Sequence, residues 1–161
     1  MLEAYQTIIE RHASTHGVPE SWIRAVIMTE SSGRASAYRE EPAIGDASYG
    51  LMQLLLRTAR GLGFTGDSQD LFDPEINIGL GTRLLSDLRR RFGSEDFARI
   101  YSAYNSGSPD RYLTSPQVAT HVGRAQEWLR QFSSDPLALS GAGVFMLSGV
   151  AWIAYRTFRR T

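Results

Sequence analysis

Apolar side chains recur three or four residues apart along most of the chain, the spacing that places them on one face of a helix. Wherever this period holds, we predict a helix. The predicted helices cover approximately residues 2–16, 19–30, 50–60, 74–92, 94–106 and 116–132. No stretch alternates between apolar and polar positions over the length of a strand. The pattern therefore predicts an all-α domain of about six helices packed on one core.

Residues that favour helix ends mark several of these boundaries. Asp73 and Ser115 each stand directly before a proline, a combination typical of a helix start because proline lacks the N–H that the first turn does not use. Gly17 and Gly93 follow the last apolar residue of their stretches, where glycine readily ends a helix. Ser48 is the expected N-cap of the helix at 50–60.

The last part of the chain has a different composition. Residues 137–155 are 19 consecutive residues without a charge. As a helix with a rise of about 1.5 Å per residue they would extend about 28 Å, close to the ~30 Å hydrocarbon core of a bilayer. Aromatic side chains and arginines at the end of this run are typical of a membrane interface. We therefore predict a folded domain at 1–132, a linker at 133–136, a transmembrane helix at 137–155 and a basic tail at 156–161.

Composition excludes several kinds of chemistry. The formal net charge is zero, so nothing in it favours nucleic acid as a partner. The chain has no cysteine, which excludes a disulfide framework, a cysteine nucleophile and a cysteine-based zinc site. The three histidines, His12, His16 and His121, do not show the spacing of metal ligands, so no metal is expected. The N-terminal residues lack the apolar core of a signal peptide.

One carboxylate falls on the apolar face of its helix. Ile23, Val26, Ile27 and Glu30 stand at positions i, i+3, i+4 and i+7, so Glu30 lies in line with the predicted core. Burial disfavours the charged form of a carboxyl group, and the negative end of the helix dipole does the same. Both effects predict a raised pKa, as a general acid requires near neutral pH. The alternative is that Glu30 turns to solvent or pairs with Arg34.

Five short motifs in order carry a resemblance to a known family. They are an ESSG that begins at Glu30, YGLMQ at Tyr49–Gln53, TARGLGF at Thr58–Phe64, LFDPEINIGLGTRLL at Leu71–Leu85 and AYNSG at Ala103–Gly107. Together they resemble the soluble lytic transglycosylase domain, a relative of goose-type lysozyme, over roughly residues 18–132. The resemblance implies a lysozyme-like helical fold and an enzyme that cleaves the glycan strands of peptidoglycan.

The resemblance also implies roles for individual residues. Glu30 matches the catalytic glutamate, and Gln53 matches the glycan-binding glutamine of the GLMQ motif. Leu55 falls where an apolar side chain lines the sugar groove. Tyr104 matches the tyrosine whose hydroxyl orients the catalytic carboxyl, and Asn105 matches the neighbouring asparagine. The expected substrate-binding residues are therefore Gln53, Leu55, Tyr104 and Asn105, and Glu30 is the expected catalytic residue.

The reaction implied by the resemblance uses a single carboxylate and needs neither a metal nor a cofactor. Glu30 protonates the oxygen between N-acetylmuramic acid and N-acetylglucosamine and then, as a base, helps the C6 hydroxyl close onto C1. The product is a 1,6-anhydromuramic end. Most glycosidases instead use two carboxylates, and Asp46 is the candidate for a second one that would restore hydrolysis. The alternative for Asp46 is a turn residue close to Ser48.

The sequence departs from the family pattern at three places. Leu56 stands where members often have a proline, the stretch at 33–48 is longer than in many members, and His121 precedes Val122 where a tyrosine is common. The last difference puts one sugar contact in doubt but not the chemistry.

The terminal arginines predict a C-terminus in the cytoplasm and a catalytic domain that faces peptidoglycan. Without a signal peptide, a phage particle or a secretion apparatus would have to carry that domain to the wall, and we favour the phage virion. Small residues in 137–155 also allow oligomerisation. Two other functions stay open: a lysozyme-like muramidase, and an inactive structural component of a virion or membrane channel.

Overall fold

The computed structural model describes residues 2–134. The predicted transmembrane helix at 137–155 and basic tail at 156–161 lie outside the described residues, as does the end of the predicted linker at 133–136. Within residues 2–134, no helix combines the length and the apolar character needed to cross a membrane.

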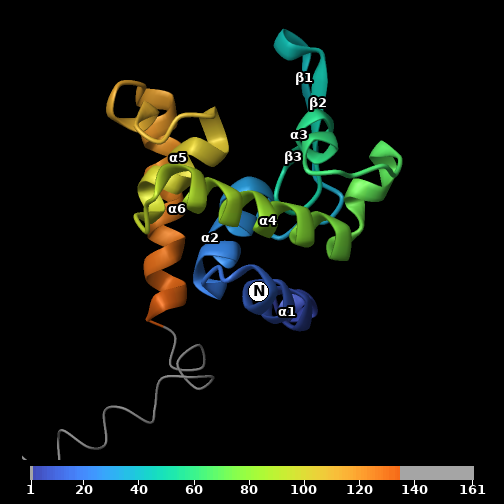
Figure 1. Ribbon diagram of the computed structural model, residues 1–161, viewed down its shortest axis with the longest axis horizontal. Coiled ribbons are helices and arrows are strands. Elements are labelled where there is room, and N and C mark those ends of the chain that lie inside the picture. Colours follow the sequence, from blue (N-terminus) through green and yellow to red (C-terminus); the bar gives the residue numbers. More distant parts are fainter. Residues whose placement is uncertain (1, 135–161) are drawn as a thin grey trace, which may run out of the picture.

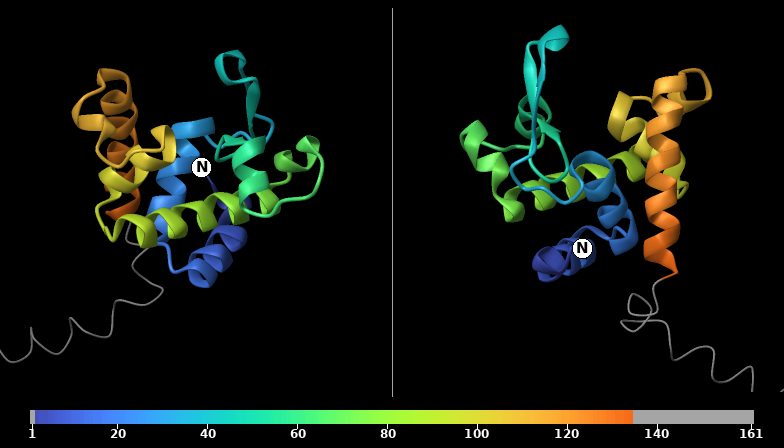
Figure 2. Two further views of the ribbon diagram at one scale, coloured as in Figure 1. Left: turned by 45° about the horizontal axis from the view of Figure 1, so that its top comes forward. Right: turned by 180° about the vertical axis from the view of Figure 1, so that it is seen from behind.

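The described residues form a mostly helical structure with one small sheet. The α-helices are α1 (Gln6–His16), α2 (Glu20–Ser31), α3 (Leu56–Gly61), α4 (Pro74–Phe92), α5 (Phe97–Ser106) and α6 (Pro116–Ser133). The strands are β1 (Tyr38–Glu41), β2 (Asp46–Tyr49) and β3 (Leu54–Leu55), and the short 3₁₀ helices are η1 (Glu3–Tyr5), η2 (Pro42–Ile44), η3 (Ser68–Phe72) and η4 (Arg111–Leu113). Figure 1 shows α4 crossing the molecule, with the β1–β2 hairpin at one end and α5 and α6 at the other. Both views in Figure 2 keep the hairpin and α6 apart.

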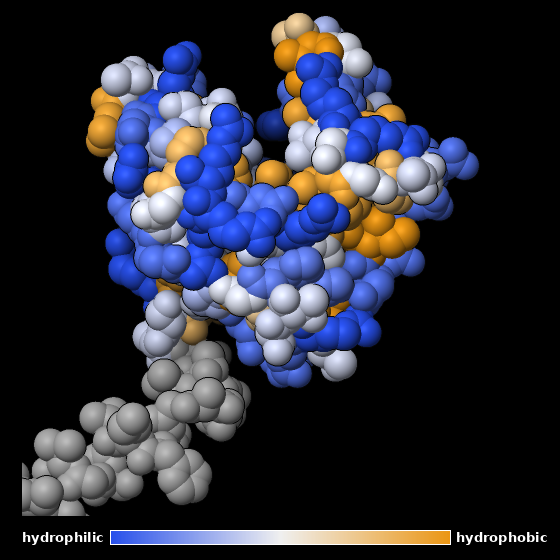
Figure 3. All heavy atoms as spheres, viewed as in Figure 1, coloured by the Kyte–Doolittle hydropathy of each residue, from blue (hydrophilic) through white to orange (hydrophobic). Residues whose placement is uncertain are grey.

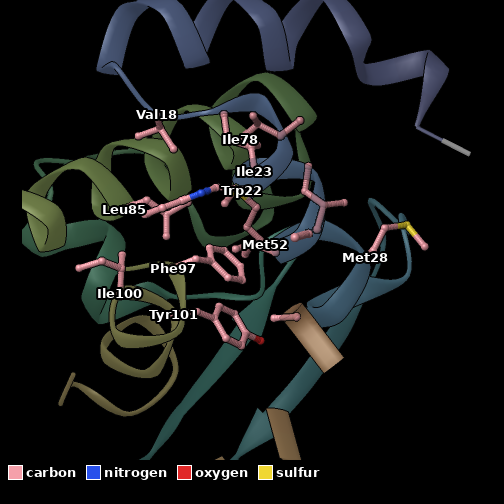
Figure 4. Packing of buried hydrophobic residues seen from close by; sticks show 14 of the residues in the cluster. Val18, Trp22, Ile23, Met28, Met52, Ile78, Leu85, Phe97, Ile100 and Tyr101 are labelled. Atoms are coloured by element: carbon pink, nitrogen blue, oxygen red, sulfur yellow. The ribbon is translucent and has the colours of Figure 1, made fainter. Parts of the chain in front are cut away.

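Helix α2 lies in the core, packed against α6 and α1. The predicted apolar stripe is confirmed, because Ile23, Val26 and Ile27 are each 0% exposed. Side chains from α2, α4 and α5 gather with Met52 in one cluster (Figure 4). Trp22 meets Phe97 edge to face, with 5.2 Å between ring centroids, which ties the start of α2 to α5. This packing fixes the direction in which α2 presents its last turn.

The prediction of an all-α domain is wrong for residues 38–55. These residues form a three-stranded antiparallel sheet in the order β1-β2-β3, with Arg39 opposite Ser48 and Tyr49 opposite Leu54. The strands are short, and β1 is largely exposed and polar. It therefore shows neither the length nor the apolar alternation by which a strand is found in a sequence.

The predicted helix at 50–60 is also wrong in its first half. Ser48 belongs to β2 and caps no helix. A tight turn follows, with positive φ at Gly50 (72°) and Gln53 (46°), and α3 begins only at Leu56. The left-handed conformation at two positions of this turn is incompatible with a continuous helix.

Asn77 of α4 holds this turn in place. Its side chain is fully buried, donates from Nδ2 to the carbonyl oxygens of Tyr49 (2.9 Å) and Leu71 (2.8 Å), and accepts from the Met52 N–H (2.8 Å). A Cβ on Gly50 would lie 2.5 Å from Asn77 Nδ2, and one on Gly81 would lie 2.4 Å from the Met52 sulfur. Close approach of α4 to the turn therefore requires glycine at both positions.

The predicted starts of α4 and α6 agree with the structure, whereas the helix predicted at 2–16 begins only at Gln6, after the 3₁₀ turn η1. Asp73 accepts from the N–H of Glu75 (2.7 Å), and Ser115 accepts from the N–H of Val118 (3.5 Å). Helix α5 is capped by Asp96, which accepts from the Ala98 N–H at 2.9 Å, so it begins slightly later than predicted.

Candidate active site

A groove separates the hairpin from the α5 side of the molecule. It contains a cavity of about 200 Å³, lined by residues of α2, β1, β2, β3, α3, α4 and α5. Figure 3 shows this hollow as a notch between two lobes of the surface. The five residues assigned by the sequence all line the cavity, and they are Glu30, Gln53, Leu55, Tyr104 and Asn105. The structure thus brings the expected catalytic and substrate-binding set together, although their roles stay predictions.

Glu30 lies in the last turn of α2, where Ser32 in the left-handed conformation (φ 55°) ends the helix. Burial raises the pKa of Glu30 to about 7. The hydrogen bond from Tyr101 and the charge of Arg39 oppose this rise in pKa, and the charge of Glu41 adds to it. At neutral pH a large fraction of Glu30 is therefore protonated and able to act as an acid.

The hydroxyl that orients Glu30 belongs to Tyr101, which corrects the role expected for Tyr104. Tyr101 donates to Glu30 Oε1 at 2.6 Å, whereas Tyr104 donates to the carbonyl oxygen of Met52 at 2.7 Å. The two tyrosines are three residues apart and share one face of α5. Helical spacing therefore cannot tell which hydroxyl reaches the carboxyl, and only the packing of α5 on α2 decides.

A row of aromatic rings on α5 supports this contact. Phe97, Tyr101 and Tyr104 stack in sequence, with centroid separations of 5.8 Å and 6.2 Å. Figure 4 shows the Phe97 and Tyr101 rings next to each other in the core. Burial raises the pKa of both tyrosines, and the charge of Glu30 raises it further. Both phenols therefore stay protonated and serve as hydrogen-bond donors. Tyr101 was not among the site residues expected from the sequence, although a buried tyrosine hydroxyl needs a partner.

Gln53 supplies a fixed amide at the cavity. Its Nε2 donates to the carbonyl oxygens of Ala37 (3.1 Å) and Gly50 (3.0 Å). The amide nitrogen is thus used to join the hairpin to the turn, and Oε1 is the atom suited to accept from a sugar N–H or hydroxyl. Leu55 is partly buried and Asn105 is exposed, so the cavity offers both an apolar and a polar surface.

Asp46, the candidate for a second carboxylate, does not line the cavity that holds Glu30. It lines a separate hollow on the outer side of the hairpin, together with Tyr38 and Glu40. Its carboxylate accepts from the backbone N–H of Ala47 (2.8 Å) and from Nε of Arg57 (3.0 Å). Burial tends to raise the pKa of Asp46, but these hydrogen bonds and the charge of Arg57 outweigh burial and lower it. The geometry gives Asp46 a structural role, but at the start of β2 and not in a turn before a helix as the alternative had it.

Three polar residues of the hairpin, Arg39, Glu41 and Ser48, line the cavity and were not foreseen. The sequence pattern predicts no helix or strand at residues 33–48, so it assigns no face to their side chains. A strand at 38–41 would have placed Arg39 and Glu41 on one side by alternation.

The histidines lie away from the cavity lining. His12 contacts Glu75 through Nε2 at 2.9 Å and stacks on His16 with 5.9 Å between centroids, while His121 lies on α6. In the part of the chain that the structure describes, no three His, Asp or Glu side chains gather where they could hold a metal ion.

Comparison with known proteins finds similarity to lytic transglycosylases. The family described as "Transglycosylase SLT domain" matches residues 7–118. The chain is 30% identical over 138 residues to "Membrane-bound lytic murein transglycosylase C" of Yersinia pestis (strain Pestoides F), with 81% of this chain and 34% of that protein covered. The protein of the same name from Yersinia pseudotuberculosis (serotype O:1b, strain IP 31758) gives the same figures. The chain thus spans about a third of the length of these curated relatives.

A solved structure shares the fold. It is an inactive mutant of the lytic transglycosylase Slt from Pseudomonas aeruginosa, with a TM-score of 0.60, 27% identity, and coverage of 81% of this chain and 23% of that chain. The family match extends from α1 into α6 and includes every element that lines the cavity around Glu30. The chain therefore belongs to the transglycosylase SLT domain family.

Proposed function

We propose that the protein is a peptidoglycan lytic transglycosylase that cleaves the β-1,4 bond between N-acetylmuramic acid and N-acetylglucosamine. The observation that carries this proposal is the state of Glu30: a carboxyl with a pKa of about 7, oriented by Tyr101, in the groove of an SLT domain. The solved relative is an inactive variant in which glutamine replaces a glutamate. That finding agrees with a reaction that depends on one carboxyl group.

In the proposed reaction, Glu30 donates its proton to the glycosidic oxygen as the bond to C1 of the muramic residue breaks. The N-acetyl oxygen of that sugar supports the developing cation. Glu30, now a carboxylate, accepts the proton of the C6 hydroxyl as the oxygen bonds to C1. Water is not consumed, and the proton returns to Glu30, so the enzyme is ready for the next cleavage.

Tyr101 supports both halves of this cycle. Its hydroxyl holds Oε1, which leaves Oε2 available for the substrate. The bond also stabilises the carboxylate that forms after the first proton transfer, since a donor to the charged form favours that form. The Oε1 contact thus limits the rotation of Glu30 while its charge changes.

The runner-up is a muramidase, which would need a second carboxylate to activate water. Asp46 accepts hydrogen bonds from Arg57 outside the cavity. Glu41 lines the cavity, but it pairs with Arg39 at 2.6 Å. Its Oε1 already accepts from Arg39 and from the Ser48 hydroxyl, so the arrangement favours the reaction that uses Glu30 alone.

The product separates the two reactions. Mass spectrometry of digested peptidoglycan should find muropeptides that end in anhydromuramic acid, lighter by one water than the products of a muramidase. The Glu30→Gln protein serves as the control for contaminating enzymes. Reducing ends alone would show a hydrolase, and no soluble product from the folded protein would support an inactive structural component.

The proposed setting is a membrane, with local penetration of the wall by a phage particle or a secretion apparatus. The support comes from the uncharged run at 137–155 with arginines after it, and from relatives whose names include "membrane-bound". The full chain should co-sediment with liposomes, and a chain that ends at Ser134 should stay in the supernatant and keep its activity. Equal sedimentation of both chains would contradict the proposed anchor.

A further inference from the structure

The two faces of β1 carry different chemistry. Arg39 and Glu41 line the cavity that contains Glu30, whereas Tyr38 and Glu40 line the hollow on the outer face of the hairpin. This is the alternation expected of a strand. The hairpin thus presents one cation and one anion to the groove, and places a third charged residue, Glu40, on its other side.

Glu41 is held in a defined position. Its Oε1 accepts from Nε of Arg39 at 2.7 Å and from Oγ of Ser48 at 3.2 Å, and Nη2 of Arg39 lies 2.6 Å from the same oxygen. Ser48 is buried and lies opposite Arg39 in the β1–β2 ladder. Because two neighbouring strands supply the three residues, backbone pairing fixes where the charges stand.

The other elements around Glu30 contribute few charges. The lining residues of β3, α3 and α4 are uncharged, and they are Leu54, Leu55, Thr58 and Leu84. On α5, Tyr101 and Tyr104 stay neutral because their pKa values are raised. On α6, the charge of Arg124 slightly opposes the raised pKa of Tyr101. Burial lowers the pKa of His121, and the charges of Arg124 and Arg39 lower it further.

Two opposite charges therefore act directly on the Glu30 carboxyl. Arg39 favours its charged form and Glu41 its neutral form. Both act through a partly open groove, since the side chains are 61% and 27% exposed. As long as the ion pair stays intact, the effect of Arg39 on the ionisation of Glu30 offsets the opposite effect of Glu41.

We propose that Arg39 and Glu41 act together as positioning residues, a charge pair on the hairpin that balances the electrostatic field at Glu30 and so sets the pH range in which the enzyme works. Neither residue is assigned to the reacting atoms. The activity part of this inference rests on the proposed function, but the ionisation of Glu30 is measurable without any substrate.

The test is a titration of the Glu30 side-chain carboxyl by ¹³C NMR at low salt, where screening is weak. The signal is assigned by its absence in Glu30→Gln. Glu41→Gln should lower the titration midpoint of Glu30, because it removes an anion and unmasks Arg39. Arg39→Gln should raise the midpoint for the opposite reason. Each shift should be on the order of 0.3–1 pH unit, as expected for one unit charge acting across a solvated groove.

Three further variants make the test specific. The double variant Arg39→Gln with Glu41→Gln should return the midpoint close to wild type. Glu40→Gln makes the same charge change on the outer face and should leave the midpoint in place. Arg39→Lys keeps the charge and should also keep the midpoint, which separates the effect of charge from loss of the two guanidinium contacts to Glu41 Oε1. Thermal melts of every variant verify that the hairpin remains folded.

Identical midpoints in Glu41→Gln, Arg39→Gln and wild type would overturn the proposal, and so would an equal shift in Glu40→Gln. If it holds, the upper limit of the pH–activity profile should follow the NMR midpoints. Shifted midpoints in a protein without activity would refute the proposed function and leave the charge pair standing. An active enzyme whose Glu30 midpoint does not shift in these variants would refute the charge pair and leave the proposed function standing.

Discussion

The two walls of the groove hold their functional residues by different means. On the helical wall, Glu30 extends from a helix whose inner face is fully buried, and Tyr101 beside it is fully buried as well. On the hairpin wall, the side chains of Arg39 and Glu41 are held by an ion pair and a short ladder at the surface. The first wall fixes the position of the acid through close packing. The second wall places two opposite charges beside the acid.

The largest expected effect is at the centre of the helical wall. Glu30→Gln should lower the cleavage rate by roughly 10²–10⁴-fold, because an amide can neither give nor recover the proton. Turnover of labelled peptidoglycan measures the rate. Glu40→Gln on the outer face of the hairpin is the matched control and should keep wild-type turnover. A Glu30→Gln protein with more than about a tenth of the wild-type rate would contradict the assignment, since it would fall outside that range.

The next largest effect concerns the turn that joins the two walls. Asn77→Ala leaves the Met52 N–H and the carbonyl oxygens of Tyr49 and Leu71 without their partner. The free energy of unfolding in urea should fall by at least roughly 3 kcal/mol, because each of the three unsatisfied buried groups costs about 1–3 kcal/mol. Asn105→Ala removes an exposed asparagine and should change the stability little. Equal stability of the two variants would show that the turn does not depend on α4.

A third prediction links the buried acid to stability. The pKa of Glu30 is about 7 in the folded protein, against roughly 4.3 in an unfolded chain. Below the lower value the group is neutral in both states and burial has no electrostatic cost. As the pH rises toward 7 the unfolded chain ionises first, and wild-type stability should fall relative to Glu30→Gln by on the order of 2–3 kcal/mol. Melting curves from pH 4 to pH 8 measure this difference, and a constant difference would contradict the raised pKa.

A smaller effect distinguishes the two tyrosines. Tyr101→Phe removes the donor to Glu30 Oε1 and should slow cleavage by about tenfold, in line with a hydrogen bond to a charged group of roughly 1.5–3 kcal/mol. Because that bond lowers the pKa of Glu30, its loss should also move the upper limit of the pH–activity profile to higher pH. Tyr104→Phe loses a bond to the Met52 carbonyl oxygen instead and should leave the limit in place. If the upper pH limit moved in Tyr104→Phe but not in Tyr101→Phe, Tyr104 would be the tyrosine that orients the carboxyl, as the family resemblance implied.

The smallest effect is expected on the outer side of the hairpin. Asp46→Asn weakens an ion pair with Arg57, whose side chain is 55% exposed, and should cost about 1 kcal/mol of unfolding free energy. The yield of anhydromuramic ends should not change, because Asp46 lies outside the cavity lining. A loss of activity with a normal melting temperature would instead make Asp46 part of the chemistry.

Local signals in the sequence were enough to place Glu30 on the helical wall. The stripe at Ile23, Val26 and Ile27 identified the buried face of α2 and placed Glu30 on it. The proline that follows Asp73 and the one that follows Ser115 marked the starts of α4 and α6. These signals work because a helix repeats its own face within a few residues and does not depend on distant partners.

The hairpin wall was not predicted, and its pairing partners explain why. Strand β1 reads Tyr-Arg-Glu-Glu, without apolar alternation, so it becomes a strand only through its ladder with β2. The turn before β3 depends on Asn77, which lies 27 positions after Gly50 in the chain. Contacts between residues so far apart leave no periodic trace in the sequence.

The sequence by itself determined the helical framework, the position of Glu30 on a buried face, and the set of motifs that line one groove. Tertiary structure alone decided that Tyr101 rather than Tyr104 donates to Glu30, that Asp46 lies outside the cavity, and that Arg39 and Glu41 face it. The physical reason is range: helix faces and caps follow from neighbours a few residues apart, whereas the partner of a hydroxyl and the field at a carboxyl depend on which elements pack together.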